Sequence, residues 1–164
     1  MQAVLHEAYL LLGSNIEAEI NIRQAIQQLH QFVCVDAVSM TWETHAVGSP
    51  GPNFLNTALK ITTGLGRSEL KNSVLRPIEQ KLGRIRTDDK NAPRTIDLDI
   101  LVFDDEICDS NLWLDVFRAL PLAELLPDLL QPQTGLTLND VAKKLQQNSF
   151  SVPHPELSDL FKQA

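Results

Sequence analysis

The chain contains few of the residues that define several large protein classes. Among its 164 residues there are only two cysteines, and 14 Lys and Arg are outnumbered by 21 Asp and Glu, for a formal net charge of −7. Cys34 and Cys108 are too far apart for a disulfide framework or a zinc knuckle, and their apolar neighbours are typical of buried thiols. The acidic balance argues against nucleic acid or a membrane surface as a partner, because both require an extended basic field.

Long hydrophobic runs and a recognisable targeting segment are also missing. The first residues, MQAVLHEAYLLLGSN, contain no basic segment followed by a long apolar core, and no window is apolar over the length that a bilayer requires. We therefore expect a protein of the reducing cytoplasm. No serine or cysteine nucleophile with a neighbouring histidine is evident, so a covalent phospho-enzyme is not indicated.

The length and the apolar content fit one domain. Hydrophobic residues make up 43% of the chain, which is enough to bury a proper core at this length. We expect residues 1–164 to form a single domain and the protein to be a monomer. The basic residues gather locally, with Arg84, Arg86, Lys90 and Arg94 in eleven positions. Such a cluster suits a small polyanion better than a duplex.

Periodic apolar residues predict an alternation of strands and helices. Strands are expected at 8–12, 33–44, 54–63 and 96–103, amphipathic helices at 17–31 and 67–82, and shorter helices at 122–130 and 138–147. Gly83 is expected to cap the second helix, and Pro77 either kinks that helix or starts a new one near Arg76. This order is the split βαβ arrangement of a ferredoxin-like α+β sandwich, an antiparallel sheet with helices packed on it.

Two carboxylates are the most informative feature of the predicted strand at 96–103. Asp97 and Asp99 alternate with apolar residues, so on a strand both leave the same face, about 6.6 Å apart. Like charges this close repel unless a cation lies between them, and hard oxygen ligands of this kind suit Mg²⁺. We expect Leu98, Ile100 and Val102 to share the opposite face, and Leu101 and Phe103 to continue the acidic one. The acidic face is therefore expected at the mouth of a cleft.

Three arginines precede these carboxylates. The guanidinium forks of Arg84, Arg86 and Arg94 match phosphate oxygens and stay charged at any working pH. Metal ligands beside arginines indicate phosphoryl or pyrophosphoryl transfer from a nucleotide. Taken alone, an Asp-x-Asp strand or an Arg-x-Arg pair is compatible with an ordinary solvated face. Because the acidic strand and the arginines are adjacent in the sequence, we favour a metal- and phosphate-binding site over a solvated face.

A family resemblance rests on four stretches. They are LLLGSN at 10–15, THAVGSPGPNFLN at 44–56, IEQKLGRIR at 78–86 and APRTIDLDILVF at 92–103. In these the chain resembles the 6-hydroxymethyl-7,8-dihydropterin pyrophosphokinases of folate biosynthesis, from residue 8 to about residue 130. The resemblance implies a ferredoxin-like fold, ATP as pyrophosphoryl donor, two Mg²⁺ ions and a pterin alcohol as acceptor.

The resemblance also assigns roles position by position. Asp97 and Asp99 would hold the two metal ions, and Arg84, Arg94, Asp97 and Asp99 would form the catalytic group. Arg84, Arg86, Arg94 and Ile100 would contact the nucleotide. The pterin would be bound by Gly13, Thr44, Val47, Phe54, Asn56, Asp97 and Phe117. Their small, apolar or amide side chains fit a flat heteroaromatic ring.

The chain departs from the family pattern after the acidic strand. The family carries a Val-Pro-His-Pro or Pro-His-Tyr segment followed by Arg and Phe, whereas here the stretch NLWLDVFRALPLAEL has no histidine and Asp115 stands where the arginine is expected. Asn91 replaces an aromatic residue and His45 a proline. A Val-Pro-His-Pro segment does occur near the C-terminus, which leaves open a chance match or a tail that folds back to bring His154 to ATP.

Three hypotheses therefore follow from the sequence. The first is a Mg²⁺-dependent pyrophosphokinase that uses ATP and hydroxymethyl-dihydropterin. The second is a divergent relative that binds a pterin or nucleotide with weak or no transfer, which the aspartate at position 115 favours because it would repel a triphosphate. The third is an RNA-binding module of ferredoxin-like architecture, against which the acidic net charge counts.

Overall fold

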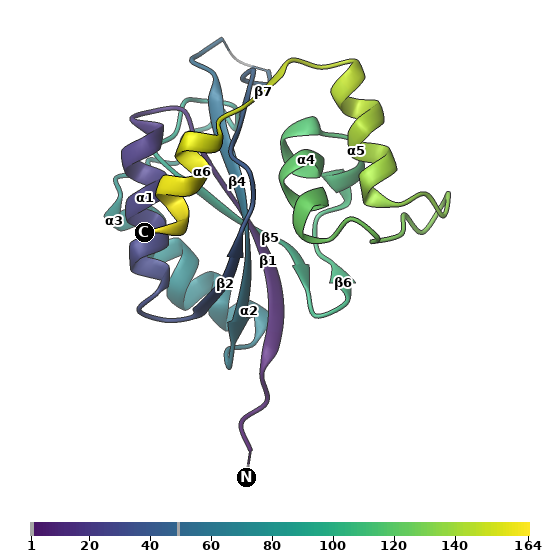
Figure 1. Ribbon diagram of the computed structural model, residues 1–164. Helices are drawn as coiled ribbons and strands as arrows, with labels where there is room; N and C mark the ends of the chain where they lie inside the picture. Colours follow the sequence, from purple (N-terminus) through teal and green to yellow (C-terminus); the bar gives the residue numbers. More distant parts are fainter. Residues whose placement is uncertain (1, 49) are drawn as a thin grey trace.

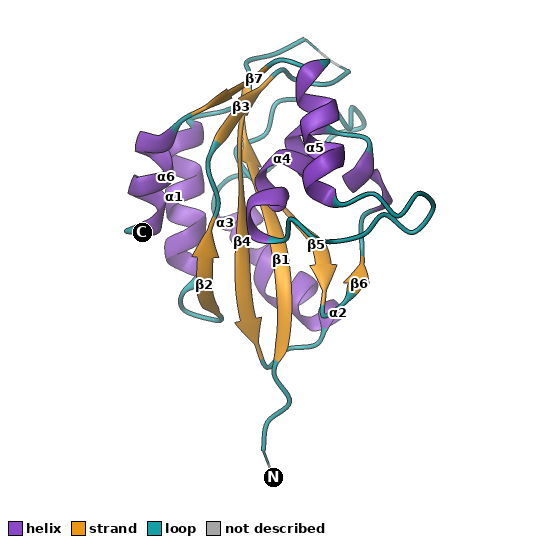
Figure 2. Ribbon diagram, turned by 45° about the vertical axis from the view of Figure 1, so that its right-hand side comes forward, coloured by secondary structure: helices purple, strands orange, loops and turns teal. Residues whose placement is uncertain are grey.

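The computed structural model describes residues 2–48 and 50–164 as one antiparallel sheet with helices on both faces (Figures 1 and 2). The strands are β1 (His6–Ser14), β2 (Cys34–Val38), β3 (Trp42–Thr44), β4 (Phe54–Thr63), β5 (Asp97–Phe103), β6 (Glu106–Ile107) and β7 (Ser151–Pro153). The helices are α1 (Ala18–Leu29), α2 (Arg67–Glu69), the π-helix η1 (Leu70–Leu75), α3 (Arg76–Lys81), the 3₁₀ helix η2 (Ser110–Trp113), α4 (Val116–Leu125), α5 (Leu138–Gln147) and α6 (Pro155–Lys162).

The strand order confirms the ferredoxin-like α+β fold predicted from the sequence. Along the sheet the order is β6, β5, β1, β4, β3 and β7, and β2 also pairs with β4. β1 and β4 are therefore central, and each lies antiparallel to the strands beside it. This arrangement places the C-terminal end of β1 next to the start of both β4 and β5.

Two hydrophobic clusters cover the two faces of the sheet. Leu10, Leu12, Ile22 and Ile26 belong to the cluster under α1, α3 and α6. The other cluster lies under α4 and α5, where Leu11 from β1 meets the apolar side of the α4 helix. Figure 1 shows these helices on opposite sides of the sheet, with the C-terminal α6 beside α1. The alternation of Leu10, Leu11 and Leu12 along β1 supplies both faces, as the two-residue period requires.

A bulge in β5 corrects the predicted face assignment of that strand. Opposite β1, the register moves by one residue between Tyr9 and Leu10, and Leu101 has no partner of its own. Beyond a bulge every side chain changes face. Leu98 and Ile100 therefore face α1 and α3 as predicted, but Val102 lies with Leu101 in the other cluster and Phe103 returns to the first. The prediction for Val102 and Phe103 was wrong.

The second helical region is interrupted where Pro77 predicted a break. α2 runs into the π-helix η1, and a new α-helix starts at Arg76 with Pro77 in its first turn. A proline in that position loses no intrahelical hydrogen bond. Gly83 follows the helix with φ of 83° and donates to the carbonyl of Gln80, as a C-terminal glycine does. Both predictions are confirmed.

Three other predicted features are corrected. The strand expected at 33–44 is two strands, because at Ser39 the side-chain hydroxyl, in place of the backbone carbonyl, accepts the N–H of Ala58 at 2.8 Å. The helix expected at 122–130 is α4, which begins at Val116 and contains Pro121. Cys34 is exposed on β2, because the strand alternates and Val35 takes the inward position, while Cys108 is half-buried.

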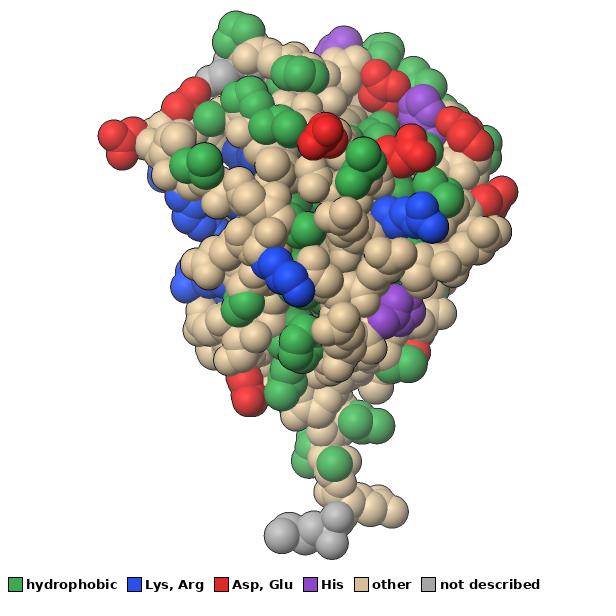
Figure 3. Space-filling model, turned by 90° about the vertical axis from the view of Figure 1, so that its left-hand side faces the viewer, with side chains coloured by type: hydrophobic (Ala, Val, Ile, Leu, Met, Phe, Trp, Pro, Cys, Tyr) green, Lys and Arg blue, Asp and Glu red, His purple; other side chains and the backbone are tan. Residues whose placement is uncertain are grey.

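The surface and the helix lengths add two observations. On the face shown in Figure 3, Lys and Arg side chains form several separate groups among acidic and apolar ones rather than one continuous patch. Within residues 2–48 and 50–164, no helix combines the length and apolarity that a bilayer crossing demands.

Candidate active site

The sheet register brings the polar residues of three strands into neighbouring rows. Gly13 of β1 pairs with Asn56 of β4 on one side and with Asp97 of β5 on the other. Two residues earlier in β1, Leu11 pairs with Asp99 of β5. A Cβ on Gly13 would lie 3.3 Å from the Asn56 side-chain oxygen, so glycine keeps the floor between the amide and the carboxylate open.

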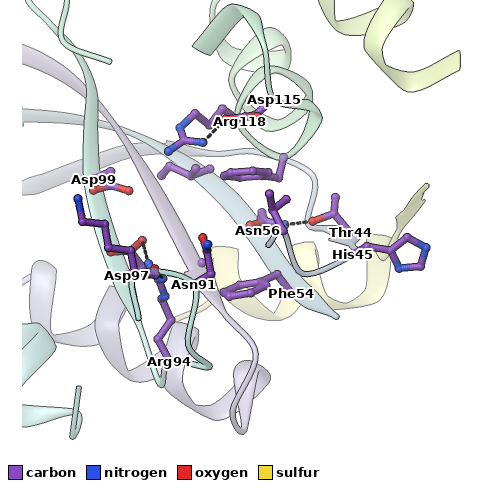
Figure 4. Close-up of a pocket in the computed structure, with 15 residues that line it drawn as sticks. Thr44, His45, Phe54, Asn56, Asn91, Arg94, Asp97, Asp99, Asp115 and Arg118 are labelled. Carbon is purple, nitrogen blue, oxygen red and sulfur yellow. Dashed lines mark hydrogen bonds and ion pairs between the residues drawn. The ribbon is translucent and has the colours of Figure 1, made fainter. Parts of the chain in front are cut away.

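A first cavity of about 270 Å³ is lined by these paired strand residues (Figure 4). It is lined by Leu11, Gly13, Thr44, His45, Val47, Phe54, Asn56, Lys90, Asn91, Arg94, Asp97, Asp99, Asp115, Phe117 and Arg118. All seven predicted pterin-binding residues are among them. Figure 4 shows Asp97 and Asp99 along one side of the cavity and Thr44 and Asn56 along another.

The amide of Asn56 is held so that its oxygen stays available. The side-chain nitrogen donates to the Thr44 hydroxyl at 2.9 Å and to the Trp42 carbonyl at 3.3 Å. The oxygen accepts no hydrogen bond from any residue in the described part of the chain. Since Asn56 is 2% exposed, this fixed acceptor, beside the ring of Phe54, can recognise the N–H edge of a flat heterocycle.

A second cavity of about 360 Å³ lies on the other side of the carboxylates. Its lining includes six cations, Lys71, Arg76, Arg84, Arg86, Lys90 and Arg94, and four acidic residues, Glu79, Asp89, Asp97 and Asp99. Lys90, Arg94, Asp97 and Asp99 line both cavities. The two carboxylates thus stand between an amide- and aromatic-lined space and a cation-rich space that suits a polyphosphate.

Both carboxylate oxygens of Asp97 accept hydrogen bonds from arginines in this structure. Arg84 donates to one of its carboxylate oxygens, and Arg94 donates to the other at 2.9 Å. Burial opposes ionisation, but the two guanidinium groups outweigh it and lower the pKa of Asp97. Arg84 also donates to Glu79 at 2.8 Å. The ion pair with Glu79 therefore positions Arg84 independently of Asp97.

Asp99 has the opposite environment, with no hydrogen bond or ion pair to any residue that the structure describes. Burial, together with the neighbouring charge of Asp97, raises the pKa of Asp99 from 3.8 to about 7, and Arg118 opposes that rise. A carboxylate that is largely removed from water and has no partner is costly unless a cation neutralises it. No group of three or more acidic, His or Cys residues in the described ranges forms a complete metal cage. Mg²⁺ commonly takes one or two carboxylates and completes its shell with phosphate and water, so this pair fits Mg²⁺ brought with a nucleotide.

The remaining predicted residues fall in different places. Arg84, Arg86 and Arg94 all line the second cavity, where Arg86 also donates to Glu79 at 3.3 Å. Ile100 lines neither cavity and packs against the cluster under α1 and α3. His154 also lines neither cavity.

The C-terminal histidine belongs to a polar chain on the opposite face of β3. The His154 ring lies 2.8 Å from a Glu43 oxygen and 2.9 Å from Glu156. The other oxygen of Glu43 accepts from Asn53 at 2.8 Å, and Asn53 contacts His45 at 3.0 Å. This chain joins the base of loop 45–53 to β7 and α6. Ser49, within this loop, lies outside the described residues.

Sequence reasoning missed two positioning residues. Buried Glu79 holds Arg84 and Arg86, and a carboxylate five residues before an arginine at a helix end is a weak signal. Asn15 receives the Arg94 N–H at 2.8 Å and donates to the Pro52 carbonyl at 3.2 Å, so it ties two loops together. The GSN turn after β1 was visible in the sequence, but its partners were not.

It also missed Arg118. Asp115, which was expected to repel a triphosphate, forms an ion pair with Arg118 across one helical turn. Burial raises the pKa of Asp115, and the Arg118 charge opposes that rise. An acid and an arginine three residues apart at the start of a helix are a recognisable pair. The helix start itself was not predicted.

Similarity to known proteins agrees with this geometry. The family model described as 7,8-dihydro-6-hydroxymethylpterin-pyrophosphokinase (HPPK) matches residues 9–127. A 2-amino-4-hydroxy-6-hydroxymethyldihydropteridine pyrophosphokinase of Bacillus subtilis is 40% identical over 140 residues, covering 78% of this chain and 83% of that protein. One from Synechocystis is 33% identical over 144 residues, covering 81% of this chain and 73% of that protein.

Solved structures agree on the fold. A crystal structure of Plasmodium falciparum HPPK-DHPS superimposes with a TM-score of 0.71 at 12% identity, covering 90% of this chain. This chain spans 46% of that longer protein. With the family model matching most of the chain and bacterial relatives at 33% and 40% identity, the chain belongs to the 7,8-dihydro-6-hydroxymethylpterin-pyrophosphokinase family.

Proposed function

We propose that this protein transfers pyrophosphate from ATP to 6-hydroxymethyl-7,8-dihydropterin, the reaction of its family, with Asp97 and Asp99 as ligands of two Mg²⁺ ions. The observation that carries the assignment of residues is the position of these carboxylates. They stand between a cavity with a fixed amide acceptor and a cavity lined by six cations. A site of this form can hold a flat acceptor in one cavity and a polyphosphate in the other, with the metal-binding carboxylates between them.

The two substrates divide between the cavities. In the first, Asn56 accepts from the pterin edge, Phe54 and Phe117 contact the ring, and Gly13, Thr44 and Val47 complete the lining. In the second, Arg84, Arg86 and Arg94 contact the triphosphate. The nucleotide contact expected of Ile100, which lines neither cavity, stays a prediction.

Transfer depends on positioning and on charge. The pterin hydroxyl oxygen attacks the β-phosphorus, the bond to the oxygen shared with the α-phosphate breaks, AMP leaves, and the hydroxyl proton passes to water. A loose transition state of this kind needs in-line alignment more than a strong base. Bound Mg²⁺ supplies charge neutralisation on the phosphate oxygens. Arg84 and Arg94, which hold Asp97 in this structure, are placed to turn to phosphate, and Glu79 keeps Arg84 at the site.

Detection of AMP is the direct test. The protein is incubated with ATP, Mg²⁺ and the hydroxymethyl-dihydropterin, and AMP rather than ADP marks pyrophosphoryl transfer. Asp97→Ala and Asp99→Ala should each lose turnover by far more than pterin affinity measured by calorimetry. Equal losses of both would point to misfolding and would remove support for the metal assignment.

A divergent relative without transfer is the second candidate, because Asp115 lines the first cavity. That hypothesis predicts pterin binding without AMP. The AMP assay therefore separates the two candidates, and the calorimetric titration shows whether a chain without transfer still binds the pterin.

Compartment and assembly are part of the proposal. We place a single domain, acting as a monomer, in the cytoplasm. There the free thiols of Cys34 and Cys108 would stay reduced.

A further inference from the structure

Arg118 occupies a position in the first cavity that none of the assigned roles uses. It lies in the first turn of α4 and its side chain is 17% exposed. Its Nε donates to Asp109 at 2.8 Å, and Nη1 donates to Asp115. The third nitrogen, Nη2, donates to no residue in the described ranges. The guanidinium is therefore fixed by two carboxylates while N–H groups remain available.

The neighbours of this guanidinium place it near the reacting groups. Its central carbon lies 4.5 Å from the centre of the Phe117 ring, so the cation rests on the face of a ring assigned to the pterin. Asp99 lines the same cavity, and Figure 4 shows Arg118 above the cavity on the side of Asp99. Arg118 does not line the second cavity, where Arg84 and Arg86 lie.

Two of the other arginines, Arg84 and Arg86, approach from the opposite side of the carboxylates. Arg84 and Arg86 line only the second cavity, whereas Arg94 lines both. A group that moves from a nucleotide in the second cavity to an acceptor in the first must pass Asp97 and Asp99, which line both cavities. In the first cavity α4 contributes one guanidinium, and its carboxylate partners fix the orientation of that group.

We propose that Arg118 is a further catalytic residue, contacting the pyrophosphoryl group on the acceptor side through Nη2 while Asp109 and Asp115 hold the guanidinium in place. This inference rests on the proposed function. Phosphate contacts by fixed donors act most strongly where charge develops during transfer, so Arg118 should affect turnover more than binding of the pterin. Asp115 then acts as a positioning residue for Arg118.

Arg118→Met tests the role because methionine keeps an unbranched apolar stem against Phe117 and removes the charge and the donors. We expect kcat to fall about a hundredfold, while the pterin Kd measured without nucleotide changes by less than about threefold. Arg118→Lys should recover part of kcat, since it restores a positive charge without the fork. Arg23→Met, on the exposed side of α1, is the matched control and should leave both quantities unchanged.

Two results would overturn the proposal. A parallel loss of kcat and pterin affinity in Arg118→Met would mean that the arginine only supports Phe117. An unchanged kcat would mean that it contacts no reacting group. Thermal unfolding of each variant identifies any folding defect.

A binding measurement separates this inference from the proposed function. Calorimetry with Mg²⁺ and the non-cleavable analogue α,β-methylene ATP, in the presence of the pterin, should give a Kd about tenfold weaker for Arg118→Met than for the wild type. An unchanged Kd together with an unchanged kcat refutes the role of Arg118. If the wild type forms no AMP, the proposed function fails, and the analogue Kd alone then decides whether Arg118 contacts phosphate.

Discussion

Asp99 is predicted to destabilise the ligand-free protein at neutral and alkaline pH. Its carboxylate is half-buried without a hydrogen bond or ion pair among the described residues, and its pKa is raised from 3.8 to about 7. The folded state therefore keeps a proton that the unfolded state releases between about pH 4 and pH 7. By proton linkage the free energy of unfolding must fall as the pH rises through that window.

Substitution by asparagine removes this effect while it keeps the size of the side chain. The gap between 3.8 and about 7 is worth at most about 4 kcal/mol at about 1.4 kcal/mol for each pKa unit. We expect Asp99→Asn to stabilise the protein by about 1 kcal/mol at pH 4.5 and by up to about 4 kcal/mol at pH 8. The low-pH value is small because the carboxyl group of Asp99 is then mostly protonated in the folded state.

Urea unfolding at pH 4.5 and pH 8, with EDTA present and no nucleotide, measures both values. Asp105→Asn is the matched control, because it removes the same charge from the exposed turn between β5 and β6. A gain for Asp99→Asn that is equal at the two pH values, or an equal gain for the control, would refute the reasoning. The carboxylate would then have to be ionised and solvated in the native site.

Three shorter predictions follow from other contacts. Asn56→Ala should weaken pterin binding by about tenfold in calorimetry, because the fixed acceptor is lost; wild-type affinity would remove Asn56 from the site. Gly13→Ala should raise the KM for the pterin with little change in the thermal midpoint, since the new Cβ would lie 3.3 Å from the Asn56 oxygen; an unchanged KM would contradict this. The hydrogen bonds to Glu156 and Glu43 raise the pKa of His154, so their stabilisation is complete below the ordinary histidine pKa and disappears as the pH rises through the folded value. His154→Gln should therefore cost about 0.5 to 1 kcal/mol in urea unfolding at pH 5.5 and nothing at pH 9; an equal cost at both would exclude the charge as its cause.

The bulge in β5 and the start of α4 show what local patterns leave undetermined. Alternation predicted correctly that Asp97 and Asp99 share a face, but it placed Val102 and Phe103 on the wrong faces beyond Leu101. A single unpaired residue reverses the pattern, and only pairing with β1 reveals it. The start of α4 at Val116 was missed for a similar reason, because the residues before Pro121 carry no clear helical period.

The sequence by itself determined the order of the main strands and helices between residues 8 and 103, and the chemistry of the acidic strand. Strand alternation, helix period and turn residues act over a few neighbours, so they can be recognised along the chain. The tertiary structure alone decided that Gly13 would separate Asn56 from Asp97, that Glu79 would hold Arg84, and that Arg118 would line the first cavity. These contacts join residues from different strands and helices, and sheet register and helix packing fix them through interactions that local periodicity does not contain.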